Sequence, residues 1–508
     1  MADFTELIDL ASLKLGATAL YANDDFFASK DNLLKVERPI FIEGKYTDRG
    51  KWMDGWESRR RRTPGHDFCL IRLGAPGLVR GVIVDTAFFK GNYPEACSIE
   101  GCSLQGQPTP EELLSASTPW VEVLPKVALQ GDSANRFEVH SAHRCTHLRL
   151  NIFPDGGVAR LRVHGEVVPD RRWLGPESHT QEVDLAAAEN GGVVVLCNDM
   201  FFGSRHNLIM PGRAVNMGDG WETKRSRKEA PDWAIVQLAG QGTLTRIEVD
   251  TNHFKGNYPE SVAIEVCDAR HRSIDDFIAD EAGWAPLLER TKLQPHTRHF
   301  FEHELLPHAL ATHARVRIFP DGGLSRLRLW GMVSEEGRAT VGLRFLATLA
   351  HHDLVATLRA CCTSQAWAEA VAKQRSFSSF DDLVKVSDRV WQALGHGDWL
   401  EAFRSHPRIG EKKSDVKRSA VAQQWSAREQ TGVSNASEAV RAKLVELNRL
   451  YEDRFGYIYI VCATGKSAEE MLAIAENRLG NPPEREIVVA AEEQRKITNL
   501  RLEKLVKR

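Results

Sequence analysis

Hydrophobic and polar positions follow two different patterns along the chain. Up to about residue 333, apolar residues alternate with polar ones in short runs, as at Leu148, Leu150 and Ile152, and Gly, Pro, Asn and Asp separate the runs. This period of two predicts antiparallel β-strands joined by turns. From about residue 340 the spacing becomes three or four, as at Val440 and Leu444, which predicts helices with one apolar face.

The β-rich part contains an internal repeat. Residues Phe89–Glu95 recur unchanged 165 positions later as Phe254–Glu260, and Asp54–Glu57 recurs at the same step as Asp219–Glu222. Residues of about 16–167 and 191–332 are therefore two copies of one domain. The many short alternating runs predict that each copy is an antiparallel β-sandwich of the jelly-roll, galactose-binding-like type.

A second repeated segment predicts a turn. Phe153–Gly157 recurs as Phe319–Gly323, and its Pro-Asp-Gly-Gly sequence lies between two alternating runs. Because glycine takes the positive φ that tight turns need, we expect a hairpin here.

The domain organisation follows from the change of pattern. The polar segment Ser334–Gly337 is expected to be a linker. We therefore expect three domains: a first β copy at 1–168, a second at 169–338 and an all-α domain at 339–508. In the last, Ser379 and Asn435 each precede an acidic residue by three positions and are expected to be N-caps. Tyr457–Ala463 is its one short β-like run.

Composition excludes several classes of protein. The net charge of −3 argues against a nucleic-acid binder. No apolar run approaches about 18 residues, so no membrane span is expected. Asp3, Glu6 and Asp9 lie among the first apolar residues, which argues against a signal peptide. The nine cysteines include no Cys-x-x-Cys pair, so we expect neither a disulfide framework nor a cysteine zinc site. A cytoplasmic protein is the simplest interpretation.

Each copy carries polar residues that no turn requires. An acid and an arginine lie three positions apart after the Asp-Gly-Trp motif, and a lysine follows an aspartate by five positions. The candidate substrate-contacting residues are Glu57, Arg60, Lys90 and Asn92 in the first copy and Glu222, Arg225, Asp250, Lys255 and Asn257 in the second. Such a set can hold a small anionic, urea-rich molecule, because Arg binds a carboxylate bidentately and carboxylates accept from urea N–H groups. It can equally form a salt-bridged rim, and the Gly-Asn-Tyr-Pro loops and Trp56 and Trp221 can be purely structural.

The two copies differ in one chemically important position. Phe88 of the first copy corresponds to His253 of the second. Imidazole titrates near neutral pH, so His253 is a candidate proton donor, although a solvated loop histidine is an alternative. His299 and His303 have i,i+4 spacing within a histidine-rich stretch, but no helix-borne Glu completes a zinc-protease pattern, and we assign no metal there.

The ordered set of repeated motifs resembles the allantoicase family over about residues 5–335. The resemblance implies two jelly-roll repeats and hydrolysis of allantoate to ureidoglycolate and urea. We expect Glu222 and His253 to be the catalytic residues of this half. Whether it needs a divalent metal is left open, as is which copy carries the site.

The helical part carries its own group of motifs. His406 and Pro407 end a predicted helix, where the histidine can project into a cleft or simply cap the helix. Ser426 and Glu429 lie three apart on one predicted helix face, and Asn477–Asn481 closes another helix.

These motifs, in this order and together with Phe455–Ile460, resemble the 2-oxo-4-hydroxy-4-carboxy-5-ureidoimidazoline (OHCU) decarboxylase family over about residues 340–505. The resemblance implies a cofactor-free helical dimer that yields (S)-allantoin. It implies that His406 and Glu429 form the catalytic pair. The substrate-binding residues that it implies are Arg478 for the anionic group, Ser426, Pro407, Ile458 and Ile460.

We therefore expect a bifunctional enzyme of purine and ureide breakdown. Its partners are small-molecule substrates, without nucleic acid or membrane, and it is expected to form a homo-oligomer through the helical domain. The alternative is an OHCU decarboxylase that carries a non-catalytic jelly-roll ligand-binding module, because a β-sandwich alone does not imply chemistry. Urea release from allantoate distinguishes the two.

Overall fold

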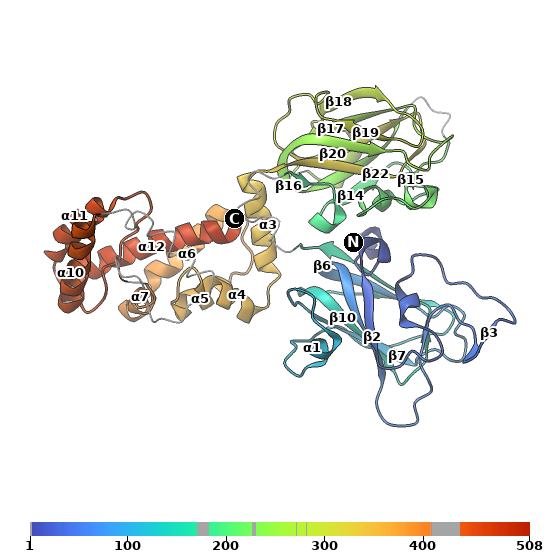
Figure 1. The fold of residues 1–508 in the computed structure, drawn as a ribbon, viewed down its shortest axis with the longest axis horizontal. Coiled ribbons are helices and arrows are strands. Elements are labelled where there is room, and N and C mark those ends of the chain that lie inside the picture. The colour runs from blue at the N-terminus through green and yellow to red at the C-terminus, as the bar shows by residue number, and fades with distance from the viewer. Residues whose placement is uncertain are drawn as a thin grey trace. The chain divides into compact units, whose positions relative to one another are not determined.

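The computed structural model describes residues 3–169, 182–225, 230–270, 272–280, 282–406, 408 and 437–507. The chain divides into two compact units, Met1–Arg338 and Ala339–Arg508. The first contains both β-rich copies and the second is helical (Figure 1). The prediction of two antiparallel β domains followed by an all-α region is confirmed.

One long strand organises the first copy. The first half of β6 (Asp67–Asp85) pairs with β10 (Arg144–Phe153), and its second half pairs with β12 (Arg160–Val167). Leu148, Leu150 and Ile152 of β10 are fully buried, as the alternation predicts. The other strands of this sheet are β1 (Ile8–Asp9), β2 (Thr18–Ala22), β7 (Ala96–Cys102), β8 (Val121–Ala128) and β9 (Ala134–Glu138), all paired antiparallel.

The second copy repeats this arrangement around β16 (Asp232–Asp250), which pairs with β20 (Ala311–Phe319) and β22 (Arg326–Val333). The remaining strands of its sheet are β13 (Val183–Asp184), β14 (Val193–Cys197), β17 (Ser261–Cys267), β18 (Ala285–Lys292) and β19 (Arg298–Phe301). The short helices α1 (Pro110–Leu114) and α2 (Ile274–Ile278) occupy corresponding places in the two copies.

The predicted hairpin at Phe153–Gly157 is wrong. Strands β10 and β12 both pair with β6, which lies between them, so they do not pair with each other. The segment instead leads into β11 (Gly157–Val158), which pairs with β5 (Trp56–Glu57). In the second copy β21 (Gly323–Leu324) pairs with β15 (Trp221–Glu222) in the same way. Alternation identified the strands but did not determine which strand is the neighbour of which.

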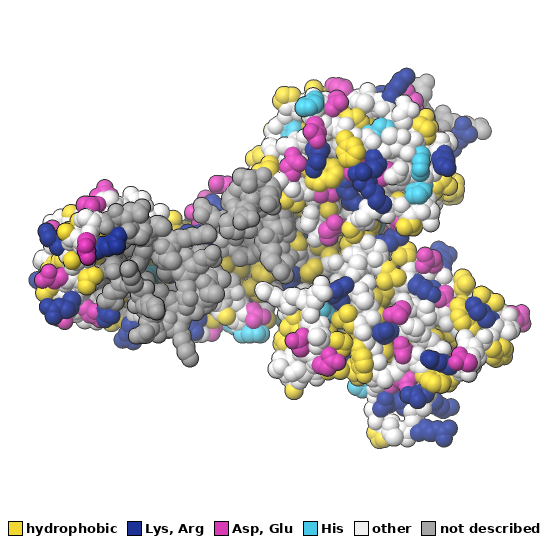
Figure 2. All heavy atoms as spheres, in the orientation of Figure 1, with side chains coloured by type: hydrophobic (Ala, Val, Ile, Leu, Met, Phe, Trp, Pro, Cys, Tyr) yellow, Lys and Arg dark blue, Asp and Glu magenta, His cyan; other side chains and the backbone are white. Residues whose placement is uncertain are grey.

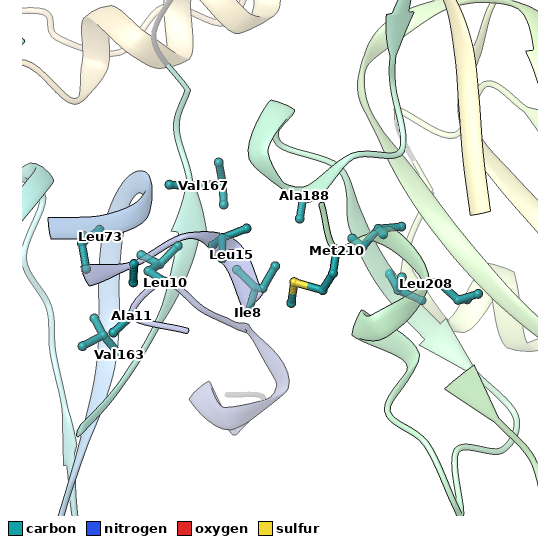
Figure 3. Close-up of a cluster of buried hydrophobic side chains, with 14 of the residues drawn as sticks. Ile8, Leu10, Ala11, Leu15, Leu73, Val163, Val167, Ala188, Leu208 and Met210 are labelled. Atoms are coloured by element: carbon teal, nitrogen blue, oxygen red, sulfur yellow. The ribbon is translucent and has the colours of Figure 1, made fainter. Parts of the chain in front are cut away.

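The two copies pack directly against each other. Figure 3 shows apolar side chains of both copies meeting in one buried cluster. Lys14 of the first copy forms an ion pair of 2.5 Å with Asp219 of the second, and Arg205 forms one of 2.6 Å with Glu6. The apolar contributors are Ile8, Leu10, Leu15 and Val167 from the first copy and Ala188, Leu208 and Met210 from the second.

An arm distinguishes the first copy. Between the corresponding residues Leu34 and Asp54 the first copy has residues 35–53, whereas between Ile209 and Asp219 the second has only 210–218. The extra length forms a small hairpin of β3 (Tyr46–Thr47) and β4 (Gly50–Lys51).

The second unit is a set of packed helices. Trp367, Phe403 and Tyr451 lie in its core with at most 1% of their surface exposed. Ser379 caps α6 as predicted, its hydroxyl accepting from the Asp382 N–H. The described helices are α3 (Glu335–Ala347), α4 (His351–Arg359), α5 (Gln365–Ala372), α6 (Phe380–Ala393), α7 (His396–Phe403), α10 (Glu438–Phe455), α11 (Ala468–Leu479) and α12 (Pro483–Lys507).

Three predictions for this region are wrong. The expected linker Ser334–Gly337 runs into the first turn of α3. Ser437 caps α10, so Asn435, which lies outside the described residues, is not its N-cap. Tyr457–Ala463 is extended but forms no strand, because side chains rather than a neighbouring strand take up its backbone groups: Arg478 donates to the Ile460 carbonyl and Cys462 N–H donates to Glu493.

Acidic and basic side chains are interspersed over most of the described surface visible in Figure 2. Among the described helices, none has both the length and the apolar character needed to span a bilayer.

Candidate functional sites

The repeated motifs meet at one end of each β copy. The Phe89 ring is fully buried against Gly157, where an added Cβ would lie 2.0 Å from a ring atom. Phe254 makes the same approach to Gly323, at 1.9 Å. The glycines of the Pro-Asp-Gly-Gly segments are therefore required by the packing of a phenylalanine from the Phe-Lys-Gly-Asn loop.

Trp56 and Trp221 have the structural role that their residue type suggests. Both side chains are fully buried. Their indole N–H groups donate at 2.8 Å to the carbonyl oxygens of Asp24 and Asp199, respectively. Each tryptophan therefore fixes the loop that precedes the catalytic candidates.

The predicted acid and amide residues form matched pairs. In the first copy Asn92 Nδ2 donates to Glu57 Oε1 at 2.6 Å, and in the second Asn257 Nδ2 donates to Glu222 Oε1. Burial raises the pKa of Glu57, although the bond from Asn92 opposes this effect. The structure thus brings residues 35 positions apart in sequence to one place in each copy.

Asp250 lies beneath this end of the second copy and is fully buried. Its carboxylate accepts from the Asn252 N–H at 2.8 Å and from Arg213 Nη1 at 3.1 Å. Arg213 also donates to Glu248. Sequence reasoning missed Arg213, although Arg38 stands at the corresponding place of the first copy, four residues after Leu34 as Arg213 is four residues after Ile209.

The arm contacts the corresponding end of the first copy. Phe41 of the arm stacks on Phe88, with ring centroids 5.8 Å apart and an interplanar angle of 27°. The Phe88 N–H donates to Asp132 Oδ1 at 2.7 Å, and Asp132 also lies 3.8 Å from the Lys90 ammonium group. The loop of the first copy thus has an aromatic ring beside it, with Phe88 still 38% exposed, and its lysine faces a carboxylate.

The same loop in the second copy has different chemistry. His253 replaces Phe88 with nearly the same backbone, φ 71° against 68°. His296 takes the place of Asp132, and its Nδ1 accepts from the His253 N–H at 2.8 Å. His253 Nε2 lies 2.9 Å from the Ala214 carbonyl oxygen, which assigns the proton to Nε2 and leaves Nδ1 for other chemistry.

The remaining cationic candidates lie at the surface. Arg60, Lys90, Arg225 and Lys255 are all exposed. In the second copy the change from Asp132 to His296 removes the carboxylate that faces Lys90 in the first. Lys255 is therefore better placed than Lys90 to attract an anion.

The histidine-rich stretch does not form the helix that its i,i+4 spacing suggested. His299 lies on β19, where Nδ1 lies 3.1 Å from the Val249 carbonyl oxygen and Nε2 accepts from the Gln294 N–H. Burial lowers the pKa of His313 to about 4. Within the part of the chain that the structure describes, no group of three His, Cys, Asp or Glu side chains is arranged to hold a metal ion.

In the helical unit, Arg478 lies at the centre of a buried polar network. Its Nε donates to Glu486 Oε1 at 2.8 Å, and its Nη1 donates to the Ile460 carbonyl oxygen at 2.8 Å. Its Nη2 donates to the Tyr451 hydroxyl at 3.2 Å, and the same hydroxyl donates to Glu486. Arg478 therefore fixes the extended segment that contains Ile460, which is buried, and Ile458, which is half-buried.

The electrostatics of this network favour a charged arginine. Burial works against the charge of Arg478, but Tyr451 and Glu486 outweigh it, so the pKa of the guanidinium is raised. Burial also raises the pKa of Tyr451. Sequence reasoning missed Glu486, which lies in the first turn of α12, just after the Asn-Arg-Leu-Gly-Asn motif.

His406 follows α7, and its backbone N–H donates to the Phe403 carbonyl oxygen at 3.1 Å. The Phe403 ring contacts Tyr457, and Tyr457 contacts Tyr451, so α7 packs onto the aromatic side of the Arg478 network. Pro407, Ser426 and Glu429 lie outside the described residues. The expected convergence of His406, Glu429 and Arg478 therefore stays a prediction.

Removing Glu486 tests the network. In a Glu486→Ala chain the buried Arg478 loses its counter-ion, and we expect the free energy of unfolding of the helical unit to fall by about 3–5 kcal/mol. Denaturant unfolding followed by tryptophan fluorescence measures this. Glu484 is exposed in the same turn of α12, so Glu484→Ala is the control and should change stability little. Equal stability of the two variants would contradict the role of Glu486.

Two β copies with carboxylate and amide pairs, followed by a helical unit with a buried arginine centre, define a multidomain metabolic enzyme. Family comparison identifies both parts: residues 8–168 and 183–334 match the allantoicase repeat, and residues 347–503 match OHCU decarboxylase. The chain belongs to the allantoicase family and carries an OHCU decarboxylase domain after the two repeats. It is a bifunctional enzyme of the allantoin pathway, as the sequence predicts.

Relatives of both parts are known. A probable allantoicase 1 of Burkholderia mallei is 47% identical over 328 residues, which are 65% of this chain and 95% of that protein. The crystal structure of allantoicase from Saccharomyces cerevisiae is similar with a TM-score of 0.54 and 34% identity, over 64% of this chain and 93% of that one. A crystal structure of OHCU decarboxylase in the presence of (S)-allantoin is 32% identical, over 30% of this chain and 96% of that one, with a TM-score of 0.26.

Proposed function

We propose that the β-rich unit hydrolyses allantoate to ureidoglycolate and urea, and that the helical unit decarboxylates OHCU to (S)-allantoin. The observation that carries this proposal is the match of the two units to two different enzyme families. The reactions are not consecutive, because allantoin must be opened to allantoate between them. Each unit therefore needs its own substrate site.

We place the allantoate site at the loop end of the second copy. Support comes from the differences between the copies: no arm is inserted there, His253 replaces Phe88 and His296 replaces Asp132. The first copy presents Phe41 stacked on Phe88 and a carboxylate beside its lysine. An anionic substrate is favoured at Lys255, because among the described residues no carboxylate faces it as Asp132 faces Lys90.

The residues of the second copy suit the hydrolysis. Arg225 and Lys255 would hold the allantoate carboxylate, and Glu222, positioned by Asn257, would accept a proton from the attacking water. The water oxygen then bonds to the central carbon as the bond from that carbon to the ureido nitrogen breaks. His253, in its doubly protonated form, would deliver the Nδ1 proton that the departing urea nitrogen needs, while Nε2–H stays bonded to the Ala214 carbonyl. Asp250 acts indirectly, by holding the backbone at Asn252 next to His253.

For the helical unit we propose that His406 is the proton donor and that Glu429 sets its tautomer. Loss of CO₂ leaves negative charge that the neighbouring imine of the substrate ring accepts, so the reaction needs orientation and a proton rather than a cofactor. Ser426, Pro407 and the backbone at Ile458 and Ile460 would line the site. Arg478 would offer its remaining N–H groups to the substrate anion while it holds the Ile460 carbonyl.

Several finer features belong to the same proposal. We propose that each β copy has a jelly-roll topology and that the chain acts in the cytoplasm. We also propose that it forms a homo-oligomer through the helical domain. The rival proposal, a decarboxylase that carries a non-catalytic ligand-binding module, is favoured if allantoate is bound but no urea is released.

A matched pair of lysines tests the placement in the second copy. Lys255→Ala should lower kcat/KM for urea release by roughly 10- to 100-fold, because a hydrogen bond to a charged group contributes about 1.5–3 kcal/mol. Lys90→Ala, the same change in the first copy, should leave urea release unchanged. Steady-state kinetics with allantoate measures both variants. The opposite order, with Lys90 essential and Lys255 dispensable, would move the site to the first copy.

A further inference from the structure

The first copy contains a pocket that the proposed reactions do not use. It has a volume of about 580 Å³ and lies on the outer face of β6, β7, β8 and β10, next to the loop of residues 58–66. None of the residues that line it belongs to the set proposed for hydrolysis. Its lining includes Arg61, Gly65, Glu100, Glu122, Arg149 and Asn151.

Asn151 lies in this pocket with 3% of its surface exposed. Its amide nitrogen donates to Ser98 Oγ at 3.2 Å and to Glu100 Oε2 at 2.9 Å. A carboxylate can only accept, so these bonds fix which end of the amide is nitrogen. The amide oxygen is buried and accepts no hydrogen bond from the described residues. Leaving such an atom unpaired costs about 1–3 kcal/mol, which a ligand N–H group would offset.

Arg61 lies in the wall of the pocket. Its Nη1 donates to Asp67 Oδ1 at 2.6 Å, while Arg61 Nε and Asp67 Oδ2 are buried without a hydrogen-bond partner in the described structure. A side chain at Gly65 would place its Cβ 2.9 Å from Arg61 Nη2, so this glycine gives the guanidinium its space. The wall therefore contains an unused donor, Arg61 Nε–H.

The second copy has changed these positions. Arg317 stands where the first copy has Asn151, and Ala263 and Pro286 stand where it has Ser98 and Glu122. Arg317 Nη1 lies 3.3 Å from Glu265, which also pairs with Arg315 at 2.7 Å. The equivalent acid in the first copy, Glu100, pairs with Arg149 alone and takes its second bond from the Asn151 amide. The amide pocket is thus particular to the first copy.

We propose that this pocket binds a small neutral ureide or cyclic amide. The two arginines and two glutamates in its lining balance in charge, which favours a neutral ligand over an anion. Ureide N–H groups match the Asn151 oxygen and the Glu122 carboxylate, and a ureide carbonyl matches Arg61 Nε–H. The volume lies in the range of pockets for small molecules. The choice of ureide rests on the proposed function, two of whose products, urea and (S)-allantoin, share this chemistry.

Calorimetric titration of the full chain with urea and with (S)-allantoin tests the proposal and separates the two sources. In the Asn151→Arg chain, which takes the residue of the second copy, we expect one binding site to be lost or weakened at least 10-fold. Urea release from allantoate should be unchanged. Because Glu122 is exposed, Glu122→Gln should weaken ligand binding at the same site without affecting the fold. Thermal unfolding monitors the fold of both variants.

Identical isotherms for the wild-type and Asn151→Arg chains would overturn the proposal. Parallel loss of binding and of urea release would also overturn it, because the pocket would then be the hydrolytic site itself. A wild-type chain that releases no urea from allantoate would refute the proposed function. The comparison of ligand binding by the wild-type and Asn151→Arg chains would still test the pocket.

Discussion

Replacement of His406 by asparagine is expected to lower the rate of enzymatic OHCU decarboxylation by roughly 10²–10⁴-fold, the usual contribution of a positioned general acid or base. Asparagine keeps a polar side chain of similar size at the end of α7 but cannot deliver a proton near neutral pH. Urea release from allantoate should be unaffected, because that site lies in the other unit. CO₂ release from freshly generated OHCU measures the first activity on the full chain, and urea formation measures the second.

A control lies on the same helix. His396 begins α7 and is exposed, with its ring 5.3 Å from that of Trp399. The His396→Asn chain should keep both activities. If His406→Asn decarboxylates as well as His396→Asn does, His406 is a helix-capping residue and not the proton donor.

Replacement of His253 by phenylalanine is the second large effect that we expect, a loss of roughly 10²–10⁴-fold in urea release. The change gives the second copy the residue of the first. The fold should accept it, because Phe88 already adopts the same positive φ, 68° against 71° for His253. Decarboxylation by the same protein preparation should be normal and serves as the internal control.

The reciprocal change sharpens this test. Phe88→His places an imidazole in the first copy, where Phe41 of the arm lies beside the loop and Asp132 accepts from the backbone. We expect no gain and no loss of urea release. Full turnover by His253→Phe would make His253 a solvated loop histidine and would remove it from the mechanism.

The fold class was predictable because its signals are local and repeated. Alternation at Leu148, Leu150 and Ile152 marks a strand with one buried face, and the recurrence of Phe89–Glu95 shows that one domain occurs twice. Pairing was not predictable from the same signals. The hairpin expected at Phe153–Gly157 fails because β6, almost 70 residues earlier in the chain, lies between the two strands.

The candidate sites were partly predictable for a similar reason. The pairs of Glu57 with Asn92 and Glu222 with Asn257 consist of residues that recur in both copies, so comparison of the copies draws attention to them. Arg213 corresponds to Arg38, but the insertion that follows Arg38 in the first copy hides this correspondence. Glu486 carries no sign in sequence that its carboxylate turns inward to Arg478, since an acid in the first turn of a helix is usually a solvated one.

The contact between the arm and the loop of the first copy could also not be predicted from the sequence pattern. Residues 35–53 read as a polar insertion with scattered aromatic residues. Only the folded chain places Phe41 of this insertion on Phe88. This contact distinguishes two loops that the repeated motif makes nearly identical in sequence.

The central claim is that one chain carries two independent catalytic sites, and the most direct test is the formation of products from allantoate by the purified full chain. Nuclear magnetic resonance can follow ureidoglycolate and urea together. The account predicts that they form in equal amounts, in wild type and in the His406→Asn chain alike. A chain that decarboxylates OHCU but binds allantoate without releasing urea would contradict it and would make the two β copies a ligand-binding module.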